Sequence, residues 1–294
     1  MNARSVNNII NKGGTILKSA RSLEFRTKAG RKKAFENLIK SKIDSLIVIG
    51  GDGSFTGAMI FEDEFKIPII GIPGTIDNDI YGTNYTIGYD TAINTVIDAI
   101  DKIRDTASSH NRLFFVEVMG RDAGHIALNA GIGAGAEEIL IPEEDLGLDR
   151  LLESLKRSEK SGKSSSIVVV AEGEKSGKNV YEIAAYVEKN LPYYEVRVSV
   201  LGHMQRGGTP TCFDRVLASR MGVYAVEKLI SGNSNDFVAA PARSIENIIT
   251  NNNLDINSID FFEINEAFSC VPLICKNKLN LNLDTVNING GGIS

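Results

Sequence analysis

The fold of this chain is constrained most by two apolar segments that each run directly into a turn rich in glycine and aspartate. Residues 45–49 lead into the turn that contains Asp52, and residues 67–72 lead into the turn that contains Asp77 and Asp79. Apolar, β-branched runs of this length are typical of strands that are covered on both faces. Open α/β sheets bind their ligands beyond the carboxyl ends of such strands. We therefore expect functional residues in both turns.

Helix and strand patterns alternate along the first 231 residues. We expect helices at residues 3–12, 29–41, 55–65, 90–107, 123–134, 148–161, 179–189 and 213–231, and strands at 45–49, 67–72, 113–118, 138–141, 167–170 and 195–201. Apolar residues recur at three- and four-residue spacing in segment 90–107, which predicts one buried helix face. The alternation predicts an α/β fold with mostly parallel sheet and right-handed crossovers.

The composition changes beyond residue 236. Residues 232–236 are typical of a linker, and asparagine-rich sequence replaces the glycine-punctuated pattern, so we expect a boundary near residues 237–241. The tail predicts helices at 242–250 and 266–278 and strands at 260–264 and 285–288.

Composition excludes several classes of protein. The 294 residues are 43% hydrophobic and 23% charged, which is typical of a globular protein with room for two domains. A formal net charge of −5 argues against a general nucleic-acid binder. No apolar run approaches the length of a membrane span and the first residues do not resemble a signal peptide, so we expect a cytoplasmic protein without membrane contact. Cys212, Cys270 and Cys275 are too few and too irregular for a disulfide framework or a zinc site.

The turn after the second apolar segment carries the most specific chemistry. Asp77 and Asp79 lie two residues apart and follow the hydroxyl of Thr75, and Gly74 frees the backbone. These groups suit a reaction that needs one base, one group near a metal, and room for a phosphate. The pattern predicts phosphoryl transfer.

The glycine turn at residues 50–54 favours anion binding at the start of a helix. Asp52 would repel a bare phosphate, so it suits this turn chiefly if Mg²⁺ lies between the two. A tight turn with Asp52 as helix cap is an equally good interpretation of this motif alone.

Basic residues gather in other predicted strand-end loops. Arg112, Arg197, His203 and Arg206 have no local cluster of carboxylates to compensate them. A lone basic residue is usually structural or solvated, but four together favour a phosphate pocket, because guanidinium groups match phosphate oxygens.

The segments at residues 50–54, 73–79, 119–121 and 202–208, in this order, resemble the bacterial-type ATP-dependent phosphofructokinases over roughly residues 3–236. The resemblance implies two doubly wound, mostly parallel sheets of phosphofructokinase type, although the family's first strands and Gly-Gly-Asp phosphate loop have no counterpart here. It also implies transfer of the γ-phosphoryl group of ATP to the 1-hydroxyl of fructose 6-phosphate. ATP is then the co-substrate and Mg²⁺ the cofactor, in a homo-oligomer, usually a tetramer, with active sites shared between subunits.

The resemblance also implies a role for each matching residue. Asp77 matches the general base, Asp52 the carboxylate at Mg²⁺, and Thr75 and Arg121 the groups that steady the phosphoryl group. The positions that match ATP contacts are Arg21, Ser22, Gly51, Asp52, Gly53 and Ser54. Those that match substrate contacts are Thr75, Ile76, Asp77, Arg112, Met119, Gly120, Arg121, Glu172, Arg197, His203, Met204, Gln205 and Arg206.

Three further implications concern particular positions. Arg112 and Arg197 match arginines that a neighbouring subunit lends, and His203 and Arg206 match the 6-phosphate site. Pyrophosphate-using relatives typically carry Asp and Lys where this chain has Gly53 and Gly74, so glycine at both indicates ATP. The positions that match a nucleotide effector site are Arg104, Glu137 and Lys163.

The tail resembles a different family. Residues 259–268 and 286–291 look like the C-terminal half of a thiolase, in which the residue matching Asn265 holds a water near the thioester oxygen. The nucleophilic-cysteine segment of thiolases has no counterpart, so acyl transfer is not expected. The domains we expect are an incomplete ATP/Mg lobe at residues 1–88 with 205–236, a fructose 6-phosphate lobe at 89–204, and the thiolase-like fragment at 237–294.

Two alternatives to the kinase stay open. One is a catalytically inactive, truncated or chimeric chain. The other is a dinucleotide-dependent oxidoreductase, which ranks last because no G-x-G-x-x-G turn with a following ribose-binding acid is present.

Overall fold

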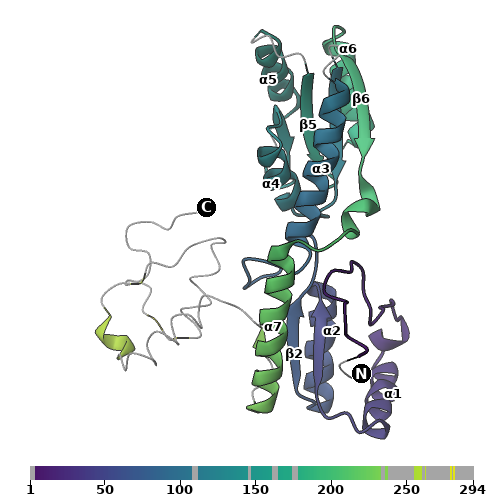
Figure 1. The fold of residues 1–294 in the computed structure, drawn as a ribbon, viewed down its shortest axis with the longest axis vertical. Helices are drawn as coiled ribbons and strands as arrows, with labels where there is room; N and C mark the ends of the chain where they lie inside the picture. Colours follow the sequence, from purple (N-terminus) through teal and green to yellow (C-terminus); the bar gives the residue numbers. More distant parts are fainter. Residues whose placement is uncertain are drawn as a thin grey trace. The chain divides into compact units, whose positions relative to one another are not determined.

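The computed structural model in Figure 1 describes residues 4–107, 112–144, 147–160, 165–173, 178–232, 236–237, 255–259, 262, 279 and 281. The chain divides into two compact units. Unit 1 comprises Met1–Leu23, Gly74–Asp79 and Thr86–Arg220, and unit 2 comprises Glu24–Pro73, Ile80–Tyr85 and Met221–Ser294.

Unit 1 is built on a parallel sheet of four strands. Its spatial order is β4 (Glu138–Leu140), β5 (Ser165–Ala171), β3 (Arg112–Val118) and β6 (Glu195–Val200). The central strand β3 pairs along its whole length with β5, from Arg112 opposite Ser165 to Val118 opposite Ala171. Since every pair in this sheet is parallel, the strands end at one edge of the sheet, and the turns that follow them meet there.

Helices cover both faces of this sheet, because successive side chains of a strand point to opposite sides. On one face Phe114 and Val116 pack with α3 (Tyr89–Ala107) and α4 (His125–Gly133). On the other face Leu113 and Phe115 pack with α5 (Leu148–Lys160) and α6 (Val180–Asn190). This layering explains why β3 has an unbroken buried run where a sheet with one wet face would alternate (Figure 1).

Unit 2 has a smaller parallel sheet in the order β1 (Leu46–Gly50), β2 (Ile69–Pro73) and β7 (Asp236–Phe237). The 3-10 helix η1 (Glu24–Arg26) precedes α1 (Lys28–Lys40), and α2 (Asp52–Phe65) follows β1. The rings of Phe35 and Phe65 stack at 4.7 Å between centroids and pack, partly buried, against the core of this unit, which contains Phe61, Ile67 and Ile69.

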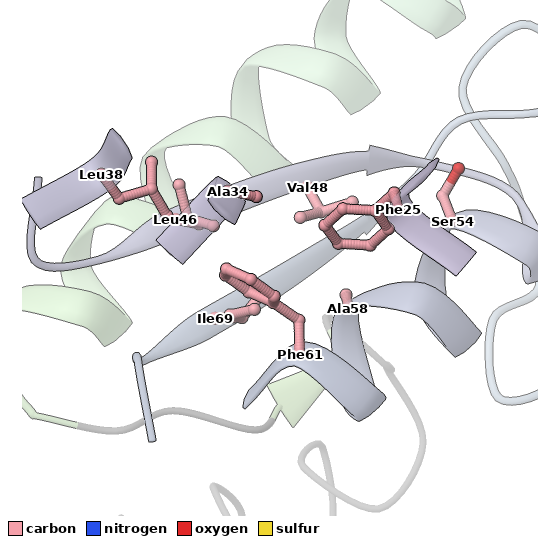
Figure 2. Close-up of a pocket in the computed structure, with 9 residues that line it drawn as sticks. All are labelled: Phe25, Ala34, Leu38, Leu46, Val48, Ser54, Ala58, Phe61 and Ile69. Carbon is pink, nitrogen blue, oxygen red and sulfur yellow. The ribbon is translucent and has the colours of Figure 1, made fainter. Parts of the chain in front are cut away.

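A half-open pocket of about 280 Å³ lies beside this core (Figure 2). Hydrocarbon side chains form nearly all of its wall, and the hydroxyl of Ser54 is the polar exception (Figure 2). An apolar pocket without charged groups does not suit an anionic ligand, so we interpret it as incompletely packed core.

The remaining elements are the 3-10 helix η2 (Gly202–Arg206), helix α7 (Cys212–Ile230), which contributes residues to both units, and the 3-10 helix η3 (Ile256–Ser258). Among the described residues, no helix combines the length and the apolar character that crossing a membrane requires.

The predicted fold class of two mostly parallel α/β sheets is confirmed, and most elements lie where expected. The helix predicted at residues 3–12 is wrong, because residues 4–8 form turns. Asn8 there adopts φ 57°, a left-handed conformation that interrupts a helix and that asparagine tolerates. Strand β7 was not predicted, because its residues were assigned to the linker or to the chain after it. The tail elements expected at 242–250, 266–278 and 285–288, and nearly all of 260–264, lie outside the described residues.

Candidate active site

The loop that follows β2 is held in one conformation by Thr86. The Thr86 hydroxyl donates to the carbonyl oxygen of Thr75 at 2.6 Å, and its backbone N–H donates to Asn78 Oδ1 at 2.9 Å. Thr86 has no exposed surface. Asn78 adopts φ 54°, so the chain turns sharply there.

Asp77, the predicted base, lies within this held loop. Its residue is 5% exposed, and its N–H donates to Thr75 Oγ1 at 3.2 Å. The preceding Ile76 packs against the core cluster that contains Val118 at the end of β3. The backbone on both sides of the carboxylate is therefore fixed, which is what a positioned base requires.

A second turn, at residues 119–121, follows β3. Gly120 has φ 141°, and a Cβ atom there would lie 2.3 Å from the carbonyl oxygen of Ala123, so only glycine fits. Arg121 adopts φ 57°. Its N–H donates to Glu172 Oε1 at 2.8 Å, while the N–H of Glu172 donates to the carbonyl of Val118 at 2.9 Å. A non-glycine residue held in this conformation is typical of functional sites.

A third turn, η2, joins the second through Gln205. The Gln205 side chain accepts a hydrogen bond from the N–H of Met119 at 3.1 Å and donates to the carbonyl of Gly202 at 3.0 Å. His203, Met204 and Arg206 are exposed. The structure thus brings together the predicted residues of both turns and Glu172.

Arg112 and Arg197 meet through a carboxylate that the sequence did not single out. Arg112 Nε donates to Glu195 Oε2 at 3.2 Å, and Arg197 Nη2 donates to Glu195 Oε1. Arg112 and Glu195 are opposite each other as the first residues of β3 and β6, and Arg197 lies two residues further along β6. Glu195 therefore holds the two guanidinium groups close together despite their like charge. The prediction that Arg112 and Arg197 lie in strand-end loops is wrong, because both are within strands, toward the edge of the sheet opposite to the turns that follow β3 and β6.

Asp214, in the first turn of α7, joins that helix to the start of α3. This residue is 2% exposed, and its carboxylate accepts from the N–H groups of Gly88 and Thr91, both at 2.9 Å, and from the Thr91 hydroxyl. The Thr211 hydroxyl donates to Asp90 Oδ2 at 2.6 Å. These bonds therefore connect the start of α3, which follows the Asp77 loop, to the start of α7, which follows η2.

In unit 2 the glycine turn starts at the end of β1, where Gly50 is opposite Pro73 of β2. A Cβ atom at Gly50 would lie 2.5 Å from Ser54 Oγ, so the turn needs glycine there. Asp52 begins α2 and is exposed.

Among the described residues no group of three or more His, Cys, Asp or Glu side chains could hold a metal by itself. A single exposed carboxylate still fits Mg²⁺, which usually takes one or two protein carboxylates and completes its shell with water and substrate phosphates.

The other predicted residues take varied positions. Arg21 and Ser22 are exposed in unit 1. Arg104 donates to the carbonyl of Ala134, and Glu137 accepts from the N–H of Ile167, so both are engaged within the fold. Lys163 lies outside the described residues.

Glu117, near the end of β3, was not predicted as a functional residue. Burial raises the pKa of its carboxyl group above the ordinary value, and the nearby carboxylate of Glu172 raises that pKa further. Near the carboxyl end of β3 there is therefore a partly buried acidic group whose ionisation is disfavoured by burial and by a neighbouring carboxylate.

Thr86, Glu195 and Asp214 were not predicted as functional residues either. Asp214 was open to detection as an acidic residue in the first turn of a predicted helix. Nothing in the local pattern indicated Thr86, whose partners Thr75 and Asn78 lie 11 and 8 residues away.

Comparison with known families agrees with this geometry. The family model described as Phosphofructokinase matches residues 1–229. The chain belongs to the phosphofructokinase family. A second family model, Thiolase, C-terminal domain, matches residues 220–294, in agreement with the resemblance of the tail.

Similar members of the phosphofructokinase family come from several bacteria. ATP-dependent 6-phosphofructokinase 2 of Bacteroides thetaiotaomicron is 56% identical over 79% of this chain and 71% of the relative. ATP-dependent 6-phosphofructokinase 1 of Thermus thermophilus is 55% identical over 80% of this chain and 72% of the relative.

Solved phosphofructokinase structures share the fold. Phosphofructokinase from Saccharomyces cerevisiae superposes with a TM-score of 0.75 at 37% identity over 79% of this chain. This chain spans 35% of the yeast chain's length.

Proposed function

We propose that this chain transfers the γ-phosphoryl group of ATP to the 1-hydroxyl of fructose 6-phosphate, and so acts in glycolysis in the cytoplasm. One observation carries the proposal. The turns at residues 119–121 and 202–206, which contain predicted sugar contacts, are linked by Gln205 and Glu172 and lie beside the loop that holds Asp77. The chain's 56% identity to a relative named ATP-dependent 6-phosphofructokinase supports the same reaction.

In this proposal Asp77 accepts the proton of the sugar's 1-hydroxyl. The hydroxyl oxygen forms a bond to the γ-phosphorus of ATP while the bond between that phosphorus and the β-phosphate oxygen breaks. Thr75 and Arg121 stabilise the charge on the moving phosphoryl group. Asp52 would hold Mg²⁺, which when bound neutralises charge on the phosphates. The product is fructose 1,6-bisphosphate.

Binding of the two substrates involves separate sets of residues. Met119, Gly120 and Glu172 contact the sugar, and His203 and Arg206 contact its 6-phosphate. The open space beside Gly53, where a Cβ atom would meet no atom within 4 Å, supports close approach of ATP to the glycine turn. Arg21, Ser22, Gly51 and Ser54 complete the ATP contacts.

We further propose a homo-oligomer, a tetramer by family resemblance. Arg112 and Arg197 then complete the 6-phosphate site of a neighbouring subunit. Their pairing through Glu195 supports this role, because it presents both guanidinium groups from one place on β3 and β6. The lobes at residues 1–88 with 205–236 and at 89–204 belong to the same proposal, as does an effector site at Arg104, Glu137 and Lys163.

A coupled assay that follows ADP formation tests the proposal, with purified chain, ATP, Mg²⁺ and fructose 6-phosphate. Replacing Asp77→Asn removes the base without changing its size, and we expect kcat to fall by a factor of about 10² to 10⁴ with a modest change of KM. Asp63→Asn, an exposed position on α2, is the control with the same change of charge. Wild-type turnover no higher than that of Asp77→Asn would instead favour a catalytically inactive chain.

A further inference from the structure

Gln205 differs from its neighbours in η2. It is 1% exposed, whereas His203, Met204 and Arg206 are exposed. The 3-10 turn thus sends one polar side chain inward and leaves the basic ones outside. A buried amide is stable only if its donor and its acceptor both find partners.

Both ends of the Gln205 amide have such partners on opposite sides. Oε1 accepts from the N–H of Met119 at 3.1 Å, and Nε2 donates to the carbonyl of Gly202 at 3.0 Å. The partners set the orientation of the amide, since an N–H needs an acceptor and a carbonyl needs a donor. Met119 begins the turn after β3 and Gly202 begins the turn after β6. The side chain therefore spans the two turns that carry the predicted sugar contacts.

We infer that Gln205 is a positioning residue that sets the spacing of the 119–121 turn and the 202–206 turn, and that it does not touch the substrate. The inference rests on the proposed function for its substrate, fructose 6-phosphate. It revises the role that family resemblance assigns to Gln205 as a direct substrate contact. With 1% exposure the side chain offers a ligand almost no surface.

The chemistry of the link requires glutamine. Leucine or methionine leaves the buried Met119 N–H and the partly buried Gly202 carbonyl without the partner that Gln205 provides. Asparagine is one methylene too short to reach both groups. Glutamate accepts from Met119 but, when ionised, has no proton to donate to Gly202 and adds a buried charge.

A direct test uses the fact that Gln205 is the only glutamine in the sequence. Selective ¹⁵N labelling of the glutamine side chain gives one NH₂ signal pair in the whole protein. We expect its hydrogens to exchange with water much more slowly than those of a free amide, and to stay protected when fructose 6-phosphate is added. Exchange at the rate of a free amide, or deprotection on adding the sugar phosphate, would overturn the inference.

Variants test what the link does. In Gln205→Met we expect the Met119 amide to lose protection in hydrogen–deuterium exchange, and the KM for fructose 6-phosphate to rise about tenfold, the effect of losing roughly one hydrogen bond. The KM for ATP should change less than about twofold. Gln205→Glu keeps the shape and one bond, so an intermediate effect is expected. Asn190→Leu is the control, because it also removes an amide that donates to a backbone carbonyl, that of Tyr186.

The outcomes separate the two proposals. Hydrogen exchange and NMR are measured without catalysis, so they test the link even if wild type shows no turnover. Absence of fructose 6-phosphate binding by wild type would contradict the proposed function and leave the exchange data to decide the role of Gln205. If Gln205→Met keeps both Met119 protection and wild-type KM values, the positioning role is wrong. A Gln205→Met chain that does not fold shifts the decision to Gln205→Glu, judged by the same two measurements.

Discussion

The arginines predicted to bind the sugar phosphate differ in whether they already pair with a carboxylate of the fold. Arg112 and Arg197 share the carboxylate of Glu195, whereas Arg206 is exposed at the end of η2. An arginine that is already paired with a carboxylate must weaken or give up that ion pair when it binds a phosphate. Arg206 has its guanidinium group in water, so its contact with a phosphate would add directly to affinity.

Replacing Arg206→Ala therefore tests the phosphate contact most cleanly. We expect the KM for fructose 6-phosphate to rise about 10- to 100-fold, because a charge-assisted hydrogen bond contributes about 1.5–3 kcal/mol. The KM for ATP should be nearly unchanged. Steady-state kinetics with each substrate varied in turn measures both, and Arg157→Ala on the exposed side of α5 is the control. A rise confined to the KM for ATP would refute the assignment.

At this scale the sequence predicted residue types better than residue roles. Asp77, Arg121 and Glu172 were predicted because they stand at strand ends or match a motif, and hydrogen bonds do link the last two. The burial of Gln205 was not predictable, because it depends on Met119, which is 86 residues away in the chain. Local pattern carries no information on such a pairing.

Between elements, Asp214 links α7 to the start of α3 through three hydrogen bonds to its carboxylate. It lies at the N-terminal ends of α7 and α3, where backbone N–H groups and helix dipoles both favour a negative charge. Its contacts are internal to unit 1 and link segments more than 120 residues apart.

We predict that Asp214→Asn lowers the free energy of unfolding by about 2–3 kcal/mol, because the amide cannot replace the charged acceptor at all its donors. Urea unfolding followed by circular dichroism measures the change. Asp63→Asn, at a side chain 87% exposed, should shift the midpoint very little. Equal effects of the two substitutions would show that Asp214 is not a link between α3 and α7.

The raised pKa of Glu117, in strand β3, predicts that the free energy of unfolding depends on pH. Burial raises its pKa in the folded state above the ordinary value of 4.5. As pH rises from about that value to the raised folded pKa, the unfolded chain loses this proton before the folded chain does, so the contribution of Glu117 to stability falls.

The Glu117→Gln variant should lose the part of the pH dependence of stability that comes from the Glu117 carboxyl group. We expect its urea midpoint to fall less than that of wild type between pH 4.5 and the raised pKa, with Glu188→Gln on the exposed face of α6 behaving as wild type. Parallel curves for wild type and Glu117→Gln would contradict the shift.

Strongly periodic elements were the most predictable. The helix expected at 90–107 is Tyr89–Ala107, and the strand expected at 113–118 is Arg112–Val118. The helix expected at 3–12 had a stripe of only three apolar residues, and the left-handed Asn8 interrupts it. Packing of a large apolar face outweighs propensity in the first two cases and is weak in the third.

For the molecule as a whole, the two units differ in how well their cores are filled. The sheet of unit 1 has many side chains with no exposed surface, whereas unit 2 has the half-open apolar pocket beside Ala58 (Figure 2). Unfilled apolar volume costs stability, because the lining atoms lack contacts on one side.

Replacing Ala58→Leu should fill part of this pocket. We expect unfolding of unit 2 to become about 0.5–2 kcal/mol less favourable, the usual gain from cavity filling. Hydrogen exchange of the amides of β1 and α2 locates the effect. Ala185→Leu, on the exposed side of α6, is the matched control. Faster exchange in Ala58→Leu would mean that the space is not available to a larger side chain.

The strand order of unit 1 has a consequence for the chain as it is made. Strand β3 lies between β5 and β6, both of which come later in the sequence, so its hydrogen bonds stay incomplete until residue 200 has been synthesised. At the ribosome's pace of about 5–20 residues per second, this largely buried strand waits for several seconds after it emerges. A nascent chain of this topology is therefore a natural client for chaperones that shield unpaired strands.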